Sequence, residues 1–151
     1  MMKGLTIRAA AAEDAEAWAR LRRLLWPEDG DTHTEEIGRY FAGPRQLPLE
    51  VFLAFDDENA AVGFIELNIR SCAEGCSSNN VGFVEGWYVL PQSRRQGIGS
   101  ALMQAGEAWA RAQGCTEFAS DTSLENEASV SVHRAVGFEE TERLVCFRKA
   151  L

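Results

Sequence analysis

Three β-prone runs follow one another near the middle of the chain, and they constrain its fold more than any other feature. Residues 49–55 and 60–70 are apolar, and the turn-forming run Asp56-Asp57-Glu58-Asn59 separates them as in a hairpin. Residues 81–90 form the third run, after which helical and strand patterns alternate. We therefore expect an α/β fold in which helices flank a mixed sheet. The expected strands are 3–9, 49–55, 60–70, 81–90, 115–121 and 143–149, and the expected helices are 13–25, 32–42, 97–113 and 125–136.

The charge balance excludes several classes of partner. The chain has 151 residues with 15 Lys+Arg against 23 Asp+Glu, a formal net charge of −8. Such a domain lacks the basic surface that binds nucleic acid or an anionic membrane, and it attracts cations instead. No stretch approaches the run of about 20 apolar residues that a membrane helix needs. Because Arg8 stands where a signal peptide would be apolar, we expect one cytoplasmic domain over residues 1–151 with four reduced cysteines.

The most informative stretch lies between the third run and the helix after it. Arg94 and Arg95 precede Gly97 and Gly99, and a helix is expected to begin there. Successive backbone N–H groups in such a turn, with a helix N-terminus behind them, form a cradle for phosphate, which glycine lets approach closely. The stretch is neither a P-loop nor a dinucleotide fingerprint, because it lacks Gly-Lys-Ser/Thr and a third glycine. A solvated surface loop is the alternative interpretation.

This loop resembles the pyrophosphate-binding loop of the GNAT superfamily of N-acetyltransferases. A second signature of that family is similar to the run from Asn126 through His133 to Gly137-Phe138, with His133 where a Tyr is usual. The resemblance implies splayed central strands that hold acetyl-CoA as the acetyl donor, with its pantetheine arm paired to backbone. The implied cofactor-binding residues are Trp87, Tyr88, Val89, Arg94, Arg95, Gln96, Gly97, Ile98, Gly99, Ser100 and Asn126.

Within the superfamily, the chain from Trp18 to Lys149 most resembles the type I aminoglycoside 6′-N-acetyltransferases. The similarity lies in Leu25-Trp26-Pro27, Gly63-Phe64-Ile65-Glu66, Phe83-Val84-Glu85-Gly86, Ala119-Ser120-Asp121-Thr122-Ser123 and residues 137–143. The group commonly carries an acidic residue and a Tyr soon after the position of Arg70, where this chain has Ser71-Cys72. The resemblance implies a homodimer, formed through C-terminal strands. It places Trp26, Asp29, Glu85, Asp121 and Glu142 around the bound substrate.

The chemistry of acetyl transfer explains why carboxylates matter here. The acceptor amine must lose a proton, and the thioester oxygen must be polarised. Glu85 and Asp121 are candidates for binding the ammonium group and accepting its proton, although Asp121 equally suits a turn cap. Glu66 lies on the polar face of an alternating strand, which is either a wall of the substrate site or a solvated face. His133 is either a proton donor to the leaving thiolate or a packed helical residue.

No cysteine has the setting of a nucleophile, so direct attack of the amine in a ternary complex is expected. Two histidines without a Cys-x-x-Cys pair give no support to a metal site. The sequence thus predicts an acetyl-CoA-dependent enzyme that acetylates the 6′-amine of aminoglycosides, an antibiotic-resistance activity. The alternatives are the same chemistry on a polyamine, another small amine or a protein amine, and a non-catalytic acyl-CoA-binding module.

Overall fold

The computed structural model describes residues 4–30, 32–45 and 47–151 of the chain. Its strands are β1 (Thr6–Ala9), β2 (Glu50–Phe55), β3 (Ala61–Arg70), β4 (Val81–Val89) and β5 (Glu117–Ser120). Its helices are α1 (Ala15–Leu25), α2 (Thr32–Ala42), α3 (Ile98–Ala112) and α4 (Glu127–Ala135), with 3₁₀ turns at Ala12–Asp14, Pro27–Asp29 and Pro91–Ser93. These bounds lie within a few residues of the expected ones, and Lys3 of the first expected strand falls outside the described residues.

The strands form one mixed sheet in the order β1-β2-β3-β4-β5. The pairs β1–β2, β2–β3 and β3–β4 are antiparallel, whereas β5 runs parallel to β4. The expected hairpin between β2 and β3 forms, because the Asp56 carboxylate accepts hydrogen bonds from the backbone N–H groups of Glu58 (3.0 Å) and Ala60 (2.9 Å). The mixed α/β sheet expected from the sequence is therefore confirmed.

β4 extends beyond the end of its pairing with β5. Their pairing joins Val81–Val84 of β4 to Glu117–Ser120 of β5. β4 continues to Val89, paired over this last stretch with β3 alone. Because β5 ends at Ser120, the backbone of β4 beyond Val84 is open on the side of β5, which is the position of the expected gap between the central strands.

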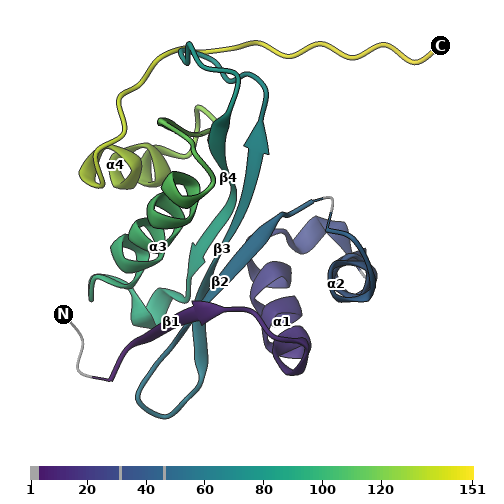
Figure 1. Cartoon of the computed structure of the whole chain (residues 1–151), viewed down its shortest axis with the longest axis vertical. Helices are drawn as coiled ribbons and strands as arrows, with labels where there is room; N and C mark the ends of the chain where they lie inside the picture. The colour runs from purple at the N-terminus through teal and green to yellow at the C-terminus, as the bar shows by residue number, and fades with distance from the viewer. Residues whose placement is uncertain (1–3, 31, 46) are drawn as a thin grey trace.

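Helices cover both faces of the sheet (Figure 1). α1 and α2 lie on one face, and α3 and α4 on the other. The core between the layers includes Trp18 and Leu21 of α1, Phe64 and Ile65 of β3, and Leu102 of α3, each at most 1% exposed. Within the described residues, no helix is long and apolar enough to cross a membrane.

Because helices cover both faces of the sheet, one of the two interpretations of β3, the solvated polar face, is wrong for Glu66. The alternating pattern of β3 suggested a solvated polar face, yet the strand is buried from Ala61 to Leu67. Glu66 is only 2% exposed. The pattern misled because α1 packs over the face that carries Glu66, and its Arg22 supplies the buried counter-charge.

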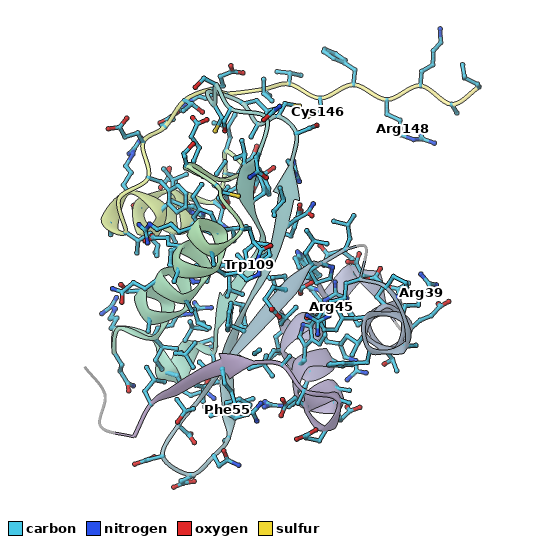
Figure 2. All side chains as sticks on the ribbon, in the orientation of Figure 1. Arg39, Arg45, Phe55, Trp109, Cys146 and Arg148 are labelled. Carbon is cyan, nitrogen blue, oxygen red and sulfur yellow. The ribbon has the colours of Figure 1, made fainter. Side chains whose placement is uncertain are left out.

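The expected last strand, 143–149, does not form within the chain. Residues 138–151 have no regular secondary structure and run away from the sheet as an extended segment (Figure 1). A strand needs a hydrogen-bonded neighbour, and this segment has none in the described part of its own chain. Cys146 consequently projects from it into solvent (Figure 2), whereas Cys115 is buried. All four cysteines are free thiols.

Candidate active site

The open edge of β4 is followed by the loop that leads into α3. Between β4 and α3, the backbone passes through left-handed conformations at Arg95 (φ 63°) and Gly97 (φ 81°). Gly97 is the N-cap, and its carbonyl accepts the hydrogen bond of the Ala101 N–H at 3.0 Å. The backbone N–H groups that precede Ala101 in the first turn have no partner within the helix, so they make a ready anion site.

Two side chains of the expected cofactor site brace this loop against β4. Arg94 Nε donates to the Val89 carbonyl at 2.8 Å, and its guanidinium carbon lies 5.5 Å from the centre of the Tyr88 ring. Trp87 Nε1 donates to the Gly99 carbonyl at 3.1 Å. Arg95 and Gln96 are exposed, Ser100 is half-buried, and the side chain of Ile98 is in the core. The loop residues expected to bind the cofactor are therefore brought together with the open edge of β4.

α4 and its N-cap carry two further predicted site residues, Asn126 and His133. Asn126 is the N-cap, and its Oδ1 accepts the Ser129 N–H at 3.1 Å. His133 lies between a hydrogen bond to the Ser120 hydroxyl (Nε2, 2.8 Å) and one to the Ser129 carbonyl (Nδ1, 2.7 Å). Its ring also packs edge-on against Trp87, 5.3 Å between ring centroids. Because a carbonyl only accepts, Nδ1 carries the proton and Nε2 accepts from Ser120.

A cavity of about 660 Å³ opens on the α1 and α2 side of the sheet. Four carboxylates border it, together with two guanidinium groups and several apolar side chains. The lining residues are Arg22, Trp26, Asp29, Glu36, Arg39, Tyr40, Pro44, Leu47, Pro48, Glu66 and Glu85. Of the residues expected around the substrate, Trp26, Asp29, Glu66 and Glu85 thus share one cavity.

Trp26 forms an aromatic wall of this cavity. It directly follows α1, and its ring lies nearly parallel to that of His33, at 20° with 6.3 Å between ring centroids. His33 Nε2 donates to the Trp26 carbonyl at 2.9 Å. The guanidinium carbon of Arg22 is 5.1 Å from the centre of the indole ring. A fixed apolar ring beside carboxylates suits a ligand that has both apolar and cationic faces.

Glu66 borders the cavity, but its carboxylate is already paired. Arg22 Nε donates to Oε2 at 2.9 Å, and Nη2 donates to Oε1 at 3.2 Å. Trp18 Nε1 adds a bond to Oε2 at 3.4 Å. Burial raises the pKa of Glu66, and the Arg22 charge opposes that shift. The geometry therefore gives Glu66 an internal counter-ion, which a substrate-binding carboxylate would not need.

Glu85 owes its orientation to a β-bulge. In the pairing of β3 with β4, Glu66 pairs with Gly86 and the next residue, Leu67, pairs with Val84. Glu85 is the extra residue between these pairs, and a bulge re-aims the side chain that it carries. Glu85 is half-buried at the cavity, and Arg70 Nη2 lies 3.0 Å from its Oε1.

Asp121 and Glu142 lie apart from the lining of this cavity. Asp121 is exposed immediately after β5. Glu142 is exposed on the extended C-terminal segment, beside Thr141, whose hydroxyl donates to the Glu74 carbonyl at 3.2 Å. Within the described residues, the cavity thus contains only part of the expected substrate site.

α2 also contributes to the cavity, which was not predicted from the sequence. Glu36 and Tyr40 stand four residues apart on this helix, so they share the face that borders the cavity. Glu36 Oε2 accepts from Arg22 Nη1 at 2.6 Å. Tyr40 donates to Glu50 Oε1 at 3.2 Å, and burial raises its pKa well above the usual range. The four-residue spacing was the only signal, and it does not distinguish a cavity wall from a core face.

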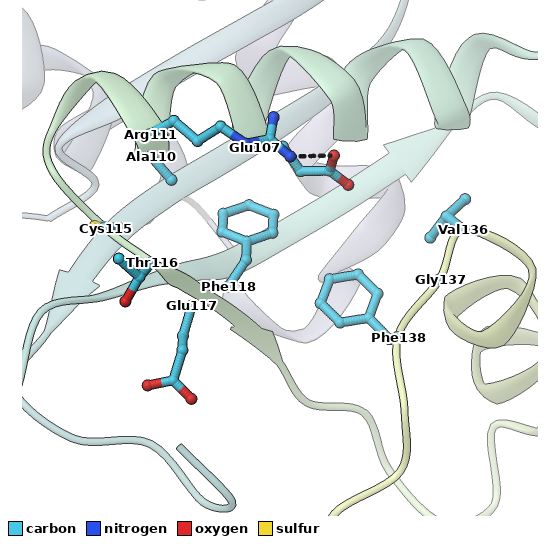
Figure 3. A pocket seen from close by; sticks show the side chains of 10 residues that line it. All are labelled: Glu107, Ala110, Arg111, Cys115, Thr116, Glu117, Phe118, Val136, Gly137 and Phe138. Carbon is cyan, nitrogen blue, oxygen red and sulfur yellow. Dashed lines mark ion pairs between the residues drawn. The ribbon is translucent and has the colours of Figure 1, made fainter. Parts of the chain in front are cut away.

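A smaller cavity, about 320 Å³, lies by the outer edge of β5 (Figure 3). Phe118 of β5 and Phe138 stack there with 6.1 Å between ring centroids. Glu107 and Arg111 of α3 form an ion pair at its rim. None of the predicted site residues lines this cavity, so it is separate from the carboxylate-lined one.

Known proteins are similar to this chain in sequence and fold over almost its whole length. Aminoglycoside N(6′)-acetyltransferase type 1 of Klebsiella aerogenes is 48% identical over 146 residues, 96% of this chain and 96% of its own. The protein of that name from Stenotrophomonas maltophilia is 47% identical over 147 residues, 97% of this chain and 94% of its own.

Solved structures agree with these relatives. AAC(6′)-Iy in complex with the bisubstrate analogue CoA-S-monomethyl-acetylneamine superposes with a TM-score of 0.90 at 38% identity, covering 99% of this chain and 100% of its own. The 6′-N-acetyltransferase AAC(6′)-Ih from Acinetobacter baumannii has a TM-score of 0.89 at 38% identity, with 98% and 99% covered. The profile of the acetyltransferase (GNAT) family matches residues 18–138. The chain therefore belongs to the acetyltransferase (GNAT) family.

Proposed function

We propose that this protein transfers the acetyl group of acetyl-CoA to the 6′-amine of aminoglycosides, and so confers resistance to them. The observation that carries the proposal is the position of the carboxylate-lined cavity. Glu85 borders it and is the first residue of the open edge of β4, two positions before Trp87. One strand therefore presents a carboxylate to a cationic amine and an unpaired backbone to the acetyl donor. The relatives named above carry this activity in their names.

The donor side of the proposal rests on the loop before α3. Acetyl-CoA supplies an activated acetyl group and carries a pyrophosphate. The N–H groups at the start of α3 and the exposed Arg95 would hold that pyrophosphate. The backbone of residues 87–89 would pair with the pantetheine arm as an added strand would. Asn126 already uses Oδ1 as a helix cap, so its Nδ2 remains to contact this arm.

On the acceptor side, a carboxylate binds the ammonium group and takes its proton. Glu85 is the carboxylate for that role, because it lies on the strand that holds the donor. The deprotonated amine then attacks the thioester carbonyl directly, and the C–S bond breaks as the C–N bond forms. Trp26 and Asp29 would hold the rest of the aminoglycoside. Asp121 and Glu142 remain proposed substrate contacts, which the bound ligand would have to reach beyond the cavity.

His133 remains a proposed proton donor to the departing thiolate. Its Nε2 accepts a hydrogen bond from Ser120, so it can donate only as an imidazolium. His133→Asn keeps a polar side chain without that capacity. If His133 supplies the proton, kcat falls in this variant while KM for both substrates stays close to that of the wild-type enzyme.

We also propose that the protein is a homodimer and works as one domain in the cytoplasm. The support for a dimer is the extended C-terminal segment, whose Val145 and Phe147 are 78% and 93% exposed. Apolar side chains in an unpaired extended segment favour pairing with another chain. Four free thiols fit a reducing compartment.

The deciding experiment measures thiol release from acetyl-CoA in the presence of kanamycin or tobramycin. We expect saturable release with both, and mass spectrometry should show one acetyl group on the 6′-nitrogen. A matched panel of spermidine, small amines and a lysine peptide tests the alternative acceptors. Binding of acetyl-CoA without turnover of any amine would instead identify a non-catalytic acyl-CoA-binding module. Glu85→Gln should abolish most turnover, whereas Glu58→Gln on an exposed turn should not.

A further inference from the structure

The two oxygens of the Glu85 carboxylate have unequal surroundings. Oε1 accepts from Asn68 Nδ2 at 3.2 Å, from Arg70 Nε at 3.2 Å and from Arg70 Nη2 at 3.0 Å. Oε2 accepts a single bond among the described residues, from Arg70 Nη2 at 3.1 Å. Since a carboxylate oxygen has two lone-pair directions, Oε1 is fully used and Oε2 keeps capacity for one further donor.

Arg70 is itself held in place. It ends β3, and its guanidinium carbon lies 3.5 Å from the centre of the Phe83 ring on β4. That ring is 2% exposed and therefore fixed by the core. A guanidinium group that stacks on a ring and presents a planar set of donors fixes the carboxylate plane more tightly than an ammonium group would.

These donors are not part of the cavity lining. Glu85 is among the residues that line it, whereas Asn68 and Arg70 are not. The bulge in β4 re-aims Glu85, which borders the cavity, and the donors that hold its carboxylate come from the neighbouring strand β3. The oxygen with free capacity, Oε2, is consequently the one left for a ligand.

We infer that Arg70 is a positioning residue for Glu85, which leaves Oε2 as the single acceptor for the proton of the substrate amine. This inference rests on the proposed function, because it assigns how the proposed base is aimed. Arg70 also offsets part of the Glu85 charge, so it weakens the attraction for an ammonium ion while it fixes the geometry of proton transfer. Its contribution therefore favours kcat over ground-state binding.

This role predicts opposite changes in turnover and affinity. Arg70→Gln should lower kcat for tobramycin about tenfold or more, because a misaligned base loses that much rate. KM and Kd for tobramycin should stay equal or decrease, because the Glu85 charge is no longer offset. Arg70→Lys keeps the charge without the planar donors, so it should restore part of kcat. KM for acetyl-CoA should not change in either variant.

A double-mutant cycle tests whether Arg70 acts through Glu85. The four proteins are the wild type, Arg70→Gln, Glu85→Gln and the double variant, with kcat from thiol release and tobramycin Kd from calorimetry. We expect the Arg70→Gln effect on both quantities to vanish when Glu85 is already Gln. Arg111→Gln, which removes the same charge from an exposed ion pair on α3, is the matched control and should leave kcat unchanged. Melting temperatures check that each variant folds.

The inference is overturned if Arg70→Gln leaves kcat unchanged, raises the Kd for tobramycin, or lowers kcat by the same factor with and without Glu85. Its failure is distinguishable from that of the proposed function. Wild-type protein that turns over no aminoglycoside disproves the proposed function, and the cycle is then run on whichever amine of the panel is acetylated. If no amine is acetylated, both proposals are wrong.

Discussion

The indole of Trp26 lies against the backbone of Gly86, so close that a Cβ at position 86 would be 2.6 Å from Cη2 of the ring. Position 86 must therefore lack a side chain if the aromatic wall of the cavity is to stay where it is. Gly86 is buried in β4 directly after Glu85, so the same stretch of strand places both the proposed base and the surface beside it.

Gly86→Ala should displace Trp26 and weaken acceptor binding. We expect KM for tobramycin to rise about tenfold or more, because small misplacements at a site are costly, and KM for acetyl-CoA to stay constant. Gly38→Ala on α2 is the control, since a Cβ there meets no atom within 4 Å. It should stabilise the protein by about 0.4–1 kcal/mol without changing KM. Equal KM values in both variants would contradict the role of Trp26.

Arg22→Met should be strongly destabilising, because it leaves the buried Glu66 carboxylate without its counter-charge. The expected loss is about 3–5 kcal/mol in urea unfolding. Replacing both partners by Met and Leu should cost less than the Arg22 change alone. Arg39→Gln, which breaks the exposed ion pair with Glu35, should cost less than about 1 kcal/mol. A loss for Arg22→Met as small as that control would refute the assignment.

The pair of Arg8 and Asp14 should make stability depend on pH in the acid range. Arg8 donates to Asp14 Oδ2 at 2.7 Å and Oδ1 at 3.0 Å, and this bonding holds the pKa of Asp14 below its ordinary value. A lowered pKa in the folded state means that the stabilisation is present above about pH 4, the unfolded value, and is lost as pH falls through the folded value. The free energy of unfolding, measured in urea, should fall less between pH 6 and pH 3 in Asp14→Asn than in the wild type. If this fall is the same in both proteins, the pair of Arg8 and Asp14 does not cause the pH dependence.

Gly97→Ala should impair the donor site selectively. A side chain at its φ of 81° costs about 1–3 kcal/mol and would shift the start of α3. We expect KM for acetyl-CoA to rise severalfold at constant KM for tobramycin. Gly114→Ala introduces the same kind of strain (φ 84°) after the other end of α3, so it should lower the melting temperature without affecting KM. If both variants raise KM for acetyl-CoA equally, the effect is one of stability alone.

Phe147→Asp should weaken the proposed dimer. Val145 and Phe147 are two residues apart in an extended segment, so they face the same way and a charge there would oppose burial against a second chain. Sedimentation velocity should show a dimer for the wild type and a lower sedimentation coefficient for the variant at equal concentration. Arg148→Ser, on the other face of the segment, is the control (Figure 2). A monomeric wild type would disprove the dimer.

Periodicity along the chain was sufficient to predict the order of the elements. α2 begins at Thr32 and ends at Ala42 as expected, because the three-residue spacing of Thr32 and Glu35, which is typical of a helix start, is local information. The expected strand 143–149 failed for the opposite reason: whether an extended segment becomes a strand depends on a neighbour that the local sequence does not specify. The loop from Arg94 to Gly99 was predictable because glycine permits the backbone conformation of such a turn and the adjacent arginines supply the positive charge that an anion needs.

The candidate site was predictable only in part. Glu66 looked available because its strand alternates, but the helix that covers it and carries Arg22 is distant in sequence. The bulge at Glu85 and the stacking of Arg70 on Phe83 depend on the register between two strands, which no single-strand pattern contains. Glu36 and Tyr40 were missed because an amphipathic helix shows which side faces inward without showing whether that side meets a core or a cavity.

The opening between β4 and β5 has a further consequence for how the two reactants meet. Glu85 and Trp87 are two positions apart on one strand, about 7 Å along its axis. The distance between the proposed base and the donor-binding edge is therefore set by covalent bonds, whereas the packing of α1, α2 or the C-terminal segment decides only which amine is admitted. Changes in those surrounding elements can therefore alter the range of acceptors without changing the reacting distance.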